Sequence, residues 1–392
     1  MAEYIFLTCQ AGMESLVKAE YLTQVPTARL AFSRRGIVTF KLPEATTEKP
    51  ASGVGVPHCL LSRTFGTSLT HVQVKPEAGS NSETGRRLGA REFDELLRDP
   101  TRFGDSALSR ELIQRAVAAA AQTQAGPWDV VHVWVRDGLL PATQGSRMPN
   151  LELPLGWQRL VTHLTEELQA AALVPANVRG NQNAEYGQRV LDFCLIEPSQ
   201  LIVGQHLVKH SFQRWSGGVI PVVPTAVPPI SRAYFKIREA VSWAGLEMRP
   251  GQTCVEIGSA PGGSCQWLLE QDLNVIGIDP ADIDPLISQH PNFTHIRRRG
   301  REVRRNELKK CDWLLSDANL PPNYVLDTIE DLVQHPQIRP RGLVLTLKLP
   351  DTKLLEHWDE WAKRVAGWGF PHTRGRQLVF NRQEICMVAT RS

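Results

Sequence analysis

The sequence predicts an α/β domain at the C-terminal side, with a mostly parallel sheet and helices on both faces, preceded by an α+β region. The first observation is a strand, a glycine turn, a helix and a second strand ending in an acid, which follow one another between Cys254 and Asp279. The second is the alternation of apolar strands with helices from there to Ala389. Such alternation is typical of a parallel sheet covered on both faces.

Composition places the chain among ordinary globular proteins. Its 392 residues are 42% hydrophobic and 22% charged, with a formal net charge of +3, so any basic surface must be local. This length predicts two or three domains. No apolar run approaches the length of a membrane span, and no secretory signal is visible. The seven cysteines are scattered without a C-x-x-C pair, which argues against a zinc site and a disulfide framework. We therefore expect a cytoplasmic protein without a membrane partner.

Before the α/β domain, strands and helices are interspersed without the glycine turns of a nucleotide site. We divide this region into an N-terminal α+β lobe (1–70) and a second part (71–215). A linker is expected at 216–230, because four prolines and two glycines lie between Gly217 and Pro229. The predicted strands are 4–8, 36–40, 69–74, 130–135, 190–196 and 201–205, the helices 14–22, 108–121 and 160–173, and the loops 49–57 and 76–84.

The C-terminal domain (231–392) opens with a helix at 231–244. After the glycine-turn unit come three further strands, at 311–317, 343–348 and 384–389, with helices at 324–334 and 353–367. In an open α/β sheet, the ligand lies beyond the carboxyl ends of the strands. The residues that follow these strands are therefore the candidates for a binding or catalytic site.

The glycine turn predicts a nucleotide-type cofactor site. It lacks the lysine of a phosphate-binding P-loop, and alanine at position 260 breaks the dinucleotide pattern G-x-G-x-x-G. An adenosine joined to something other than a pyrophosphate still fits, and S-adenosylmethionine is such a molecule. Asp279 stands about twenty residues past the first glycine, a spacing that suits a ribose diol. The alternative is a structural turn. The predicted cofactor residues in the turn are Gly258, Ser259, Ala260, Pro261, Gly262 and Gly263.

Two polar residues end the later strands at this same edge. Asp317 follows one apolar strand, and Lys348 closes the next. Taken singly, Asp317 is compatible with a helix cap and Lys348 with a surface lysine whose stem is buried. Together, beside the predicted turn, they indicate a site in which Asp317 also lies near the cofactor.

Several short motifs in this order resemble the FtsJ-type RNA ribose 2′-O-methyltransferases. They are Ser231-Arg232-Ala233-Tyr234-Phe235-Lys236, the Gly258 turn, Ser316-Asp317, Leu347-Lys348-Leu349-Pro350 and Arg382-Gln383-Glu384. The resemblance implies a Rossmann-like methyltransferase domain, S-adenosylmethionine as cofactor, RNA as partner and a catalytic tetrad. By motif, that tetrad is Lys236, Asp317, Lys348 and Glu384.

One branch of this family is similar over more of the chain. It comprises bacterial enzymes that methylate a cytidine ribose in 23S ribosomal RNA and carry an N-terminal THUMP-type RNA-binding domain. The shared features are the first strand ending in Cys9, Gly12-Met13-Glu14, the hairpin around Gly204 and Arg376-Gln377-Leu378. They imply that residues 71–215 are THUMP-like and that the substrate is large-subunit ribosomal RNA.

The tetrad suits methyl transfer to a hydroxyl, which is a poor nucleophile until a general base removes its proton. We expect Lys348 to be that base. Partial burial and the nearby charge of Lys236 would lower its pKa, while Asp317 and Glu384 would orient the lysines. No metal is required, because no phosphoryl group moves and no water is activated.

Two features leave alternatives open. Family members often carry an acid after the third strand, near the adenine, whereas this chain has Ile296-Arg297-Arg298-Arg299-Gly300-Arg301. An RNA-binding or ribosome-assembly factor with a weakened methyltransferase domain therefore remains an alternative. The same segment opens a basic run that is either a phosphate-contacting strip or a solvated loop. Its members are Arg297, Arg298, Arg299, Arg301, Arg304, Arg305, Lys309 and Lys310.

Overall fold

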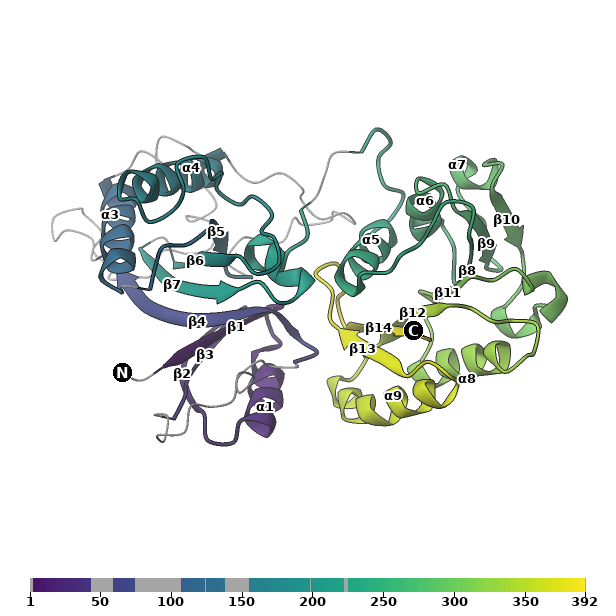
Figure 1. Cartoon of the computed structure of the whole chain (residues 1–392). Coiled ribbons are helices and arrows are strands. Elements are labelled where there is room, and N and C mark those ends of the chain that lie inside the picture. Colours follow the sequence, from purple (N-terminus) through teal and green to yellow (C-terminus); the bar gives the residue numbers. More distant parts are fainter. Residues whose placement is uncertain are drawn as a thin grey trace, which may run out of the picture. The chain divides into compact units, whose positions relative to one another are not determined.

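The computed structural model describes residues 3–43, 59–74, 107–123, 125–137, 155–197, 199–221 and 225–391. The chain divides into two compact units, and the division falls between Pro221 and Thr225, inside the predicted linker 216–230 (Figure 1). The predicted loops 49–57 and 76–84 lie outside the described residues. Within the described ranges, no helix is both long and apolar enough to cross a membrane.

The first unit is built on one seven-stranded sheet. Adjacent strands of this sheet are antiparallel, except for β5 and β6, which are parallel. The strand order is β2 (Arg29–Arg34), β3 (Ile37–Lys41), β1 (Tyr4–Cys9), β4 (Ser62–Gln73), β7 (Gln200–Leu207), β6 (Arg189–Glu197) and β5 (Val130–Val135).

This sheet corrects the prediction of two lobes divided after residue 70. Strand β4 runs across that position and pairs with β1 on one side and with β7 on the other. Backbone hydrogen bonds therefore continue from the N-terminal strands into the later ones. The whole region up to Pro221 is one folding unit in the structure, and its assignment as THUMP-like stays a prediction.

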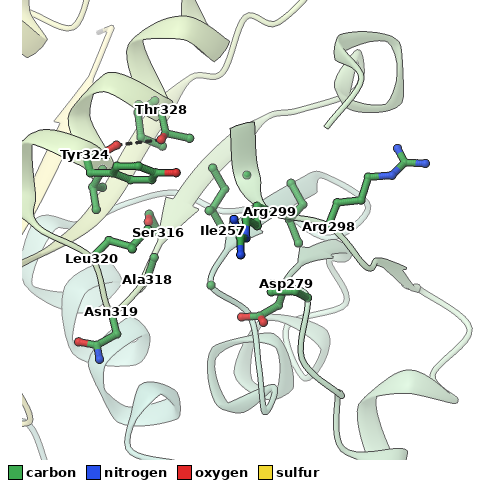
Figure 2. Close-up of a pocket in the computed structure, with 16 residues that line it drawn as sticks. Ile257, Asp279, Arg298, Arg299, Ser316, Ala318, Asn319, Leu320, Tyr324 and Thr328 are labelled. Atoms are coloured by element: carbon green, nitrogen blue, oxygen red, sulfur yellow. Dashed lines mark hydrogen bonds between the residues drawn. The ribbon is translucent and has the colours of Figure 1, made fainter. Parts of the chain in front are cut away.

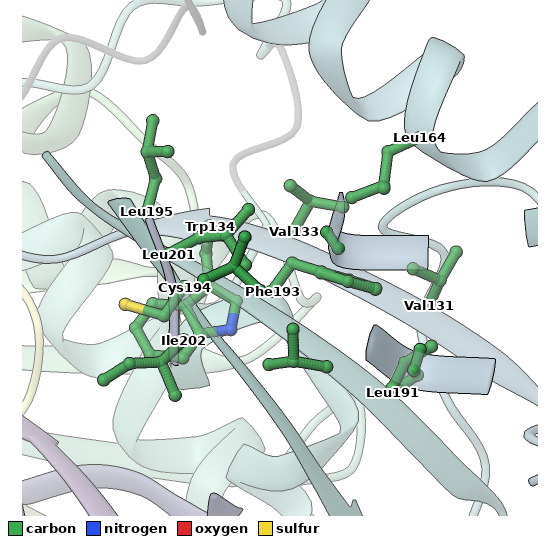
Figure 3. Packing of buried hydrophobic residues seen from close by; sticks show 14 of the residues in the cluster. Val131, Val133, Trp134, Leu164, Leu191, Phe193, Cys194, Leu195, Leu201 and Ile202 are labelled. Atoms are coloured by element: carbon green, nitrogen blue, oxygen red, sulfur yellow. The ribbon is translucent and has the colours of Figure 1, made fainter. Parts of the chain in front are cut away.

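Helices cover the sheet of the first unit. Helix α1 (Glu14–Gln24) packs on β1–β3, where the rings of Tyr21 and Phe40 lie 4.6 Å apart. Helices α3 (Ala107–Gln122) and α4 (Leu155–Ala170) pack against each other and supply apolar side chains to the main core. Figure 3 shows Leu164 of α4 above the strand residues of this core, among them Val131, Val133, Leu191 and Phe193.

After β7, the chain forms two short 3-10 turns, η1 (Ser211–Arg214) and η2 (Ser216–Gly218), that pack on β4 and β5. Gly218 has φ +73°, and a Cβ there would lie 2.3 Å from the carbonyl oxygen of Arg63. Because only glycine tolerates both the backbone angle and the close approach, this segment is bound tightly to the first unit.

The second unit is a doubly wound sheet. Its order is β10 (Phe293–Ile296), β9 (Asn274–Ile278), β8 (Thr253–Ile257), β11 (Trp313–Ser316), β12 (Gly342–Lys348), β14 (Glu384–Thr390) and β13 (His372–Arg376). The first five strands are parallel, and β14 is antiparallel to both of its neighbours. The chain winds outward from β8 in both directions, so the carboxyl edge between β8 and β11 is the topological switch point.

Helices lie on both faces of this sheet, as the sequence predicts (Figure 1). These helices connect successive parallel strands, so the carboxyl ends of the parallel strands lie at one edge, where the antiparallel β14 begins. The helices are α5 (Ala233–Ala244), α6 (Gly263–Leu269), α7 (Pro285–Ser288), α8 (Pro322–Val333) and α9 (Trp358–Gly367), with 3-10 turns η3 (Gly300–Glu302), η4 (Arg305–Leu308) and η5 (Thr352–His357).

Candidate active site

Four charged side chains, predicted from motifs spread over about 150 residues of chain, meet at the carboxyl edge of the second sheet. Lys236 comes from the first turns of α5, Asp317 follows β11, Lys348 ends β12 and Glu384 begins β14. We call these four residues the tetrad. All four side chains are largely buried, with exposed fractions of 9%, 16%, 19% and 10% in that order.

Each carboxylate of the tetrad contacts both lysines. The Nζ atom of Lys236 lies 3.2 Å from Asp317 Oδ2 and 2.5 Å from Glu384 Oε2. The Nζ atom of Lys348 lies 3.3 Å from Asp317 Oδ1 and 2.8 Å from Glu384 Oε1. Two cations and two anions thus form a closed, formally neutral group. Such mutual pairing offsets the cost of burying four ionised side chains.

The sheet itself brings Lys348 and Glu384 together. In the antiparallel pairing of β12 with β14, these two residues are direct partners in the register. Directly opposed residues in a sheet place their side chains on the same face, within reach of each other. The ion pair therefore follows from strand pairing rather than from a flexible loop.

Helix α5 is held against the start of β14 by contacts with the segment just before that strand. Phe235 stacks on Phe380 with ring centroids 4.8 Å apart. The buried Glu239 accepts hydrogen bonds of 3.0 Å from the backbone N–H of Val379. Arg232 donates to the carbonyl of Phe380 at 3.3 Å. These contacts position Lys236 beside Glu384.

The charges of the tetrad correct one expectation about Lys348. Burial alone lowers its pKa, but the charges of Asp317 and Glu384 and the hydrogen bonds to both carboxylates raise it by more. The net pKa of Lys348 therefore lies above the ordinary lysine value, not below it. Two carboxylates within 3.3 Å outweigh the effect of burial on the pKa of Lys348.

The glycine turn is shaped by close backbone contacts. Gly258 has φ +84°, and a Cβ there would lie 2.6 Å from Cα of Ala318, just beyond β11. Gly262 has φ +117°, and its Cβ would meet Ile287 of α7 at 2.9 Å. The turn thus lies directly against the end of β11, with no side chain between them. Such a cradle leaves backbone atoms free to approach a ligand.

A pocket of about 450 Å³ opens beside this turn. Figure 2 shows Asp279, Arg298 and Arg299 on one side and Asn319, Leu320 and Tyr324 on the other. Its volume lies in the usual range for small-molecule sites. Among the predicted cofactor residues, Gly258 and Asp279 line the pocket, while the rest of the turn, Ser259 to Gly263, does not.

Asp279 links the second strand to the turn. Its carboxylate accepts hydrogen bonds from the backbone N–H of Ala260, at 3.2 Å, and of Ala281, at 2.8 Å. A carboxylate offers about four lone-pair positions, so Asp279 still has capacity for a ligand hydroxyl. Asp317 reaches the tetrad instead of this pocket, which its chain neighbours Ser316 and Ala318 line.

These features accord with the family comparison. Residues 229–364 match the FtsJ-like methyltransferase family. The resemblance indicated by the sequence motifs is thereby confirmed for this part of the chain, as is the Rossmann-like methyltransferase fold.

The chain is also similar to several individual proteins. The chain is 28% identical over 172 residues to the ribosomal RNA large subunit methyltransferase M of Methylococcus capsulatus, covering 42% of this chain and 47% of that protein. It is 27% identical over 213 residues to the protein of the same name from Xylella fastidiosa strain M12, covering 51% and 58%. The chain thus spans about half the length of these relatives. The crystal structure of TrmN from Thermus thermophilus is similar over 99% of both chains, with 13% identity and a TM-score of 0.32.

The FtsJ-like domain contains pocket residues that the sequence analysis did not propose. Tyr324 and Leu320 form one wall, and the guanidinium of Arg301 lies 3.8 Å from the ring centroid of Tyr324. In the sequence, only their position marks these two residues, because they follow soon after Asp317, at the carboxyl end of a strand. Arg298 and Arg299 stand where an acid was expected, and Arg298 turns to an ion pair with Glu307 at 3.0 Å.

Several side chains of the basic run form ion pairs within the FtsJ-like domain. Four of its arginines pair with acids, and two of those acids lie on α8. The pairs are Arg297 with Asp282, Arg298 with Glu307, Arg301 with Asp327, and Arg305 with Asp331. The exposed Arg299, Arg304, Lys309 and Lys310 have no acidic partner among the described residues. These four are the remaining candidates for phosphate contacts.

A buried acid also lies beneath the tetrad. Glu256 of β8 is 2% exposed and accepts a hydrogen bond from the Cys265 thiol at 3.0 Å. Burial raises the pKa of Glu256 to about 7, and the charges of Asp317 and Asp279 act in the same direction. The sequence predicts no role for Glu256, since its position inside an apolar strand carries no sign of its neighbours.

Proposed function

We propose that this protein transfers a methyl group from S-adenosylmethionine to a ribose 2′-hydroxyl of RNA. The tetrad carries the proposal, since two lysines and two carboxylates are paired at 2.5–3.3 Å on the edge of an FtsJ-like domain, beside a glycine-turn pocket. The cofactor supplies the methyl group on a sulfonium. The protein must then bind the acceptor, orient its hydroxyl and take up its proton.

Lys348 is the better placed of the two lysines to receive that proton. Its side chain is 19% exposed, whereas that of Lys236 is 9% exposed. A general base must come within hydrogen-bond reach of the hydroxyl, which requires an accessible nitrogen. Lys236 instead supports Asp317 and Glu384 from the interior. These carboxylates hold the Lys348 amine in place.

The raised pKa of Lys348 has a chemical consequence. In the ligand-free protein, Lys348 holds its proton at neutral pH and cannot accept another. The lysine must therefore lose that proton before each turnover. The carboxylates that fix its position also oppose this loss, so the rate depends on pH.

The pocket and the turn fit the cofactor. Gly258 brings the backbone of the turn close to the end of β11, and the carboxylate of Asp279 faces the adjoining pocket. We propose that Asp279 binds the ribose hydroxyls of the cofactor. The turn Gly258 to Gly263 and Asp317 are the other residues that we place next to the cofactor. Leu320 and Tyr324 supply an apolar wall for the adenine ring.

Large-subunit ribosomal RNA is the substrate that we propose, because the similar proteins of Methylococcus and Xylella carry that name. We assign RNA affinity to the first unit, including the THUMP-like part 71–215, and chemistry to residues 231–392. The cytoplasm, where ribosomal RNA is assembled, is the proposed location.

Mass spectrometry of ribosomal RNA nucleosides tests this proposal. We expect one 2′-O-methylated nucleoside of large-subunit RNA to disappear in cells that lack the gene and to return with the wild-type gene. Purified protein should restore it on RNA from those cells when S-adenosylmethionine is added. A protein that binds this RNA but neither binds the cofactor nor restores the mark would instead be an assembly factor.

A further inference from the structure

Three buried polar residues in the first unit form a cluster far in sequence from the tetrad. His132 lies on β5, Asp192 on β6 and His206 on β7. His132 and Asp192 are direct partners in the parallel register, and Asp192 is opposite Gly204, two residues before His206. Since side chains alternate along a strand, all three face the same side of the sheet.

The outer nitrogen of each histidine is fixed by a backbone carbonyl. Nε2 of His132 lies 3.0 Å from the Gln182 carbonyl oxygen, and Nε2 of His206 lies 2.9 Å from that of Gln213. A carbonyl only accepts, so each Nε2 carries a proton. Each Nδ1 therefore faces the inside of the cluster.

The inner nitrogens differ in what they contact. Nδ1 of His206 lies 2.5 Å from Asp192 Oδ2. Nδ1 of His132 is buried and has no hydrogen-bond partner in the described part of the chain. His132 is fully buried, and because its Nε2–H is engaged by the Gln182 carbonyl, its Nδ1 presents a lone pair to the inside of the cluster. An Asp192–His206 pair alone would account for two of the three residues and leave this lone pair unsatisfied.

We propose that His132, Asp192 and His206 form a site for a divalent transition-metal ion, Zn²⁺ in the first instance. One ligand atom from each residue lies within 4.8 Å of the other two. Ligand atoms around tetrahedral zinc, at about 2.0–2.1 Å from the metal, lie roughly 3.3 Å apart. On metal binding, the distance between His206 Nδ1 and Asp192 Oδ2 would increase slightly, and His132 Nδ1 would move closer to both atoms.

The surroundings match those of metal-binding histidines. Such ligands commonly donate their second ring N–H to a backbone carbonyl, which fixes the tautomer and aims the other nitrogen at the metal. Here Gln182 and Gln213 supply both carbonyls. A pocket of about 210 Å³, lined in part by His206 and Gln213 but not by His132 or Asp192, reaches the outer side of the His206 ring.

The site would be structural. It joins three neighbouring strands, while the carbonyls that orient its histidines belong to the connecting segments before β6 and after β7. Methyl transfer needs no contribution from it. The spacing of the cysteines carries no sign of such a site, because its ligands are two histidines and an aspartate that only folding brings together.

Metal analysis of the untagged, full-length protein tests the proposal. Protein prepared with zinc and without chelators should hold one Zn²⁺ per chain after gel filtration. Removing the ion should lower the melting temperature by several degrees, and zinc should restore it. Co²⁺ in its place should give the visible bands of a tetrahedral site without a thiolate charge-transfer band. Wild-type protein that holds no zinc and melts unchanged in excess Zn²⁺ would overturn the proposal.

Two variants locate the ion. His132→Phe keeps a ring of similar size but removes the ligand, so it should lose the zinc and its effect on melting. His71→Ala, a histidine on β4 outside the cluster, should keep both. Equal zinc content in His132→Phe and wild type would place the ion elsewhere. If His132→Phe does not fold, the wild-type stoichiometry and the Co²⁺ spectrum still decide.

Discussion

Lys348 provides the most direct test at the scale of single residues. We expect Lys348→Ala to lower the single-turnover rate by about two to four orders of magnitude, the usual loss when a general base is removed. Lys348→Arg should lower the single-turnover rate to a similar extent, because a guanidinium keeps its proton in this pH range. Cofactor affinity should change only a few-fold in both variants, since this lysine lies in the tetrad and not in the pocket.

Lys353→Ala is the matched control, because Lys353 is an exposed lysine five residues further along the chain. It should leave rate and affinity unchanged. If Lys348→Arg keeps more than about a tenth of the wild-type rate, general-base catalysis by this residue is excluded.

The carboxylates predict a shift in the pH–rate profile. Asp317 and Glu384 raise the pKa of Lys348, so the neutral amine grows more abundant as pH rises towards that pKa. Glu384→Gln removes one of the two raising charges. Its single-turnover rate, relative to its own maximum, should therefore rise at lower pH than in the wild type. Rapid-quench experiments at several pH values measure this profile. A midpoint of the pH–rate profile that is unchanged or higher in Glu384→Gln would contradict the role given to these charges.

Glu256 predicts a pH-dependent stability. Folding raises its pKa from 4.5 to about 7. The stability that Glu256 contributes to the fold is therefore fully present below pH 4.5 and is lost as pH rises through 7. Glu256→Gln mimics the protonated acid. We expect the variant to be more stable than wild type at pH 8.5 by on the order of a few kcal/mol, with the difference vanishing near pH 4, below the unfolded-state pKa.

Urea unfolding at both pH values measures this difference. Glu247→Gln is the control, because the side chain of Glu247 is 80% exposed. It should show no such pH-dependent gain. An equal gain for Glu256→Gln at both pH values would indicate a cause other than ionisation.

At the scale of elements, the sequence predicts those whose periodicity is regular. Helix α5 and strands β5 and β12 were found within a few residues, because their apolar spacing is clear. Strand β2 was missed, since none of its residues is buried and no alternation marks it. Only the second half of β4 was found, because its first half is buried on both faces and does not alternate.

The loop after β10 gives a prediction about RNA. Arg301 and Arg305 pair with acids of α8, whereas Lys309 and Lys310 are exposed and free of acidic partners among the described residues. Replacing both lysines with alanine should weaken RNA binding and reduce the salt dependence by about 0.7–0.9 of log–log slope per lost phosphate contact. Filter binding at several salt concentrations measures this slope.

Lys363→Ala is the control, because Lys363 is an exposed lysine on α9 that does not belong to the basic run. It should preserve the salt dependence. An unchanged slope in the double variant would show that the basic run is a solvated surface.

At the scale of the whole molecule, the division into two units predicts separable tasks. A fragment of residues 225–392 contains the complete seven-stranded sheet, the tetrad and the pocket. It should fold and bind S-adenosylmethionine in calorimetry with the affinity of the full chain. Its methylation of RNA should be poor, because the first unit is missing. Full activity of the fragment on free RNA would show that the first unit is dispensable.

The two units also differ in how far the sequence could predict them. The resemblance to the FtsJ-type family predicts the whole tetrad, whereas strand ends alone predict only that Asp317 and Lys348 share one edge of the sheet. The continuous sheet of the first unit could not be predicted in this way. The pairing of β4 with β7 joins Thr67 to Gln205, residues separated by well over a hundred positions, and no local pattern records such a contact.

The register between β12 and β14 limits which changes in chain length this protein can tolerate. Lys348 is opposite Glu384 only because the segment between β13 and β14 has its present length. One inserted residue that shifted this pairing by one position would put Ile385 or Gln383 opposite Lys348 and turn the carboxylate to the other face. Insertions and deletions in residues 377–383 should therefore be rare among active homologues, even where individual side chains in that segment vary freely.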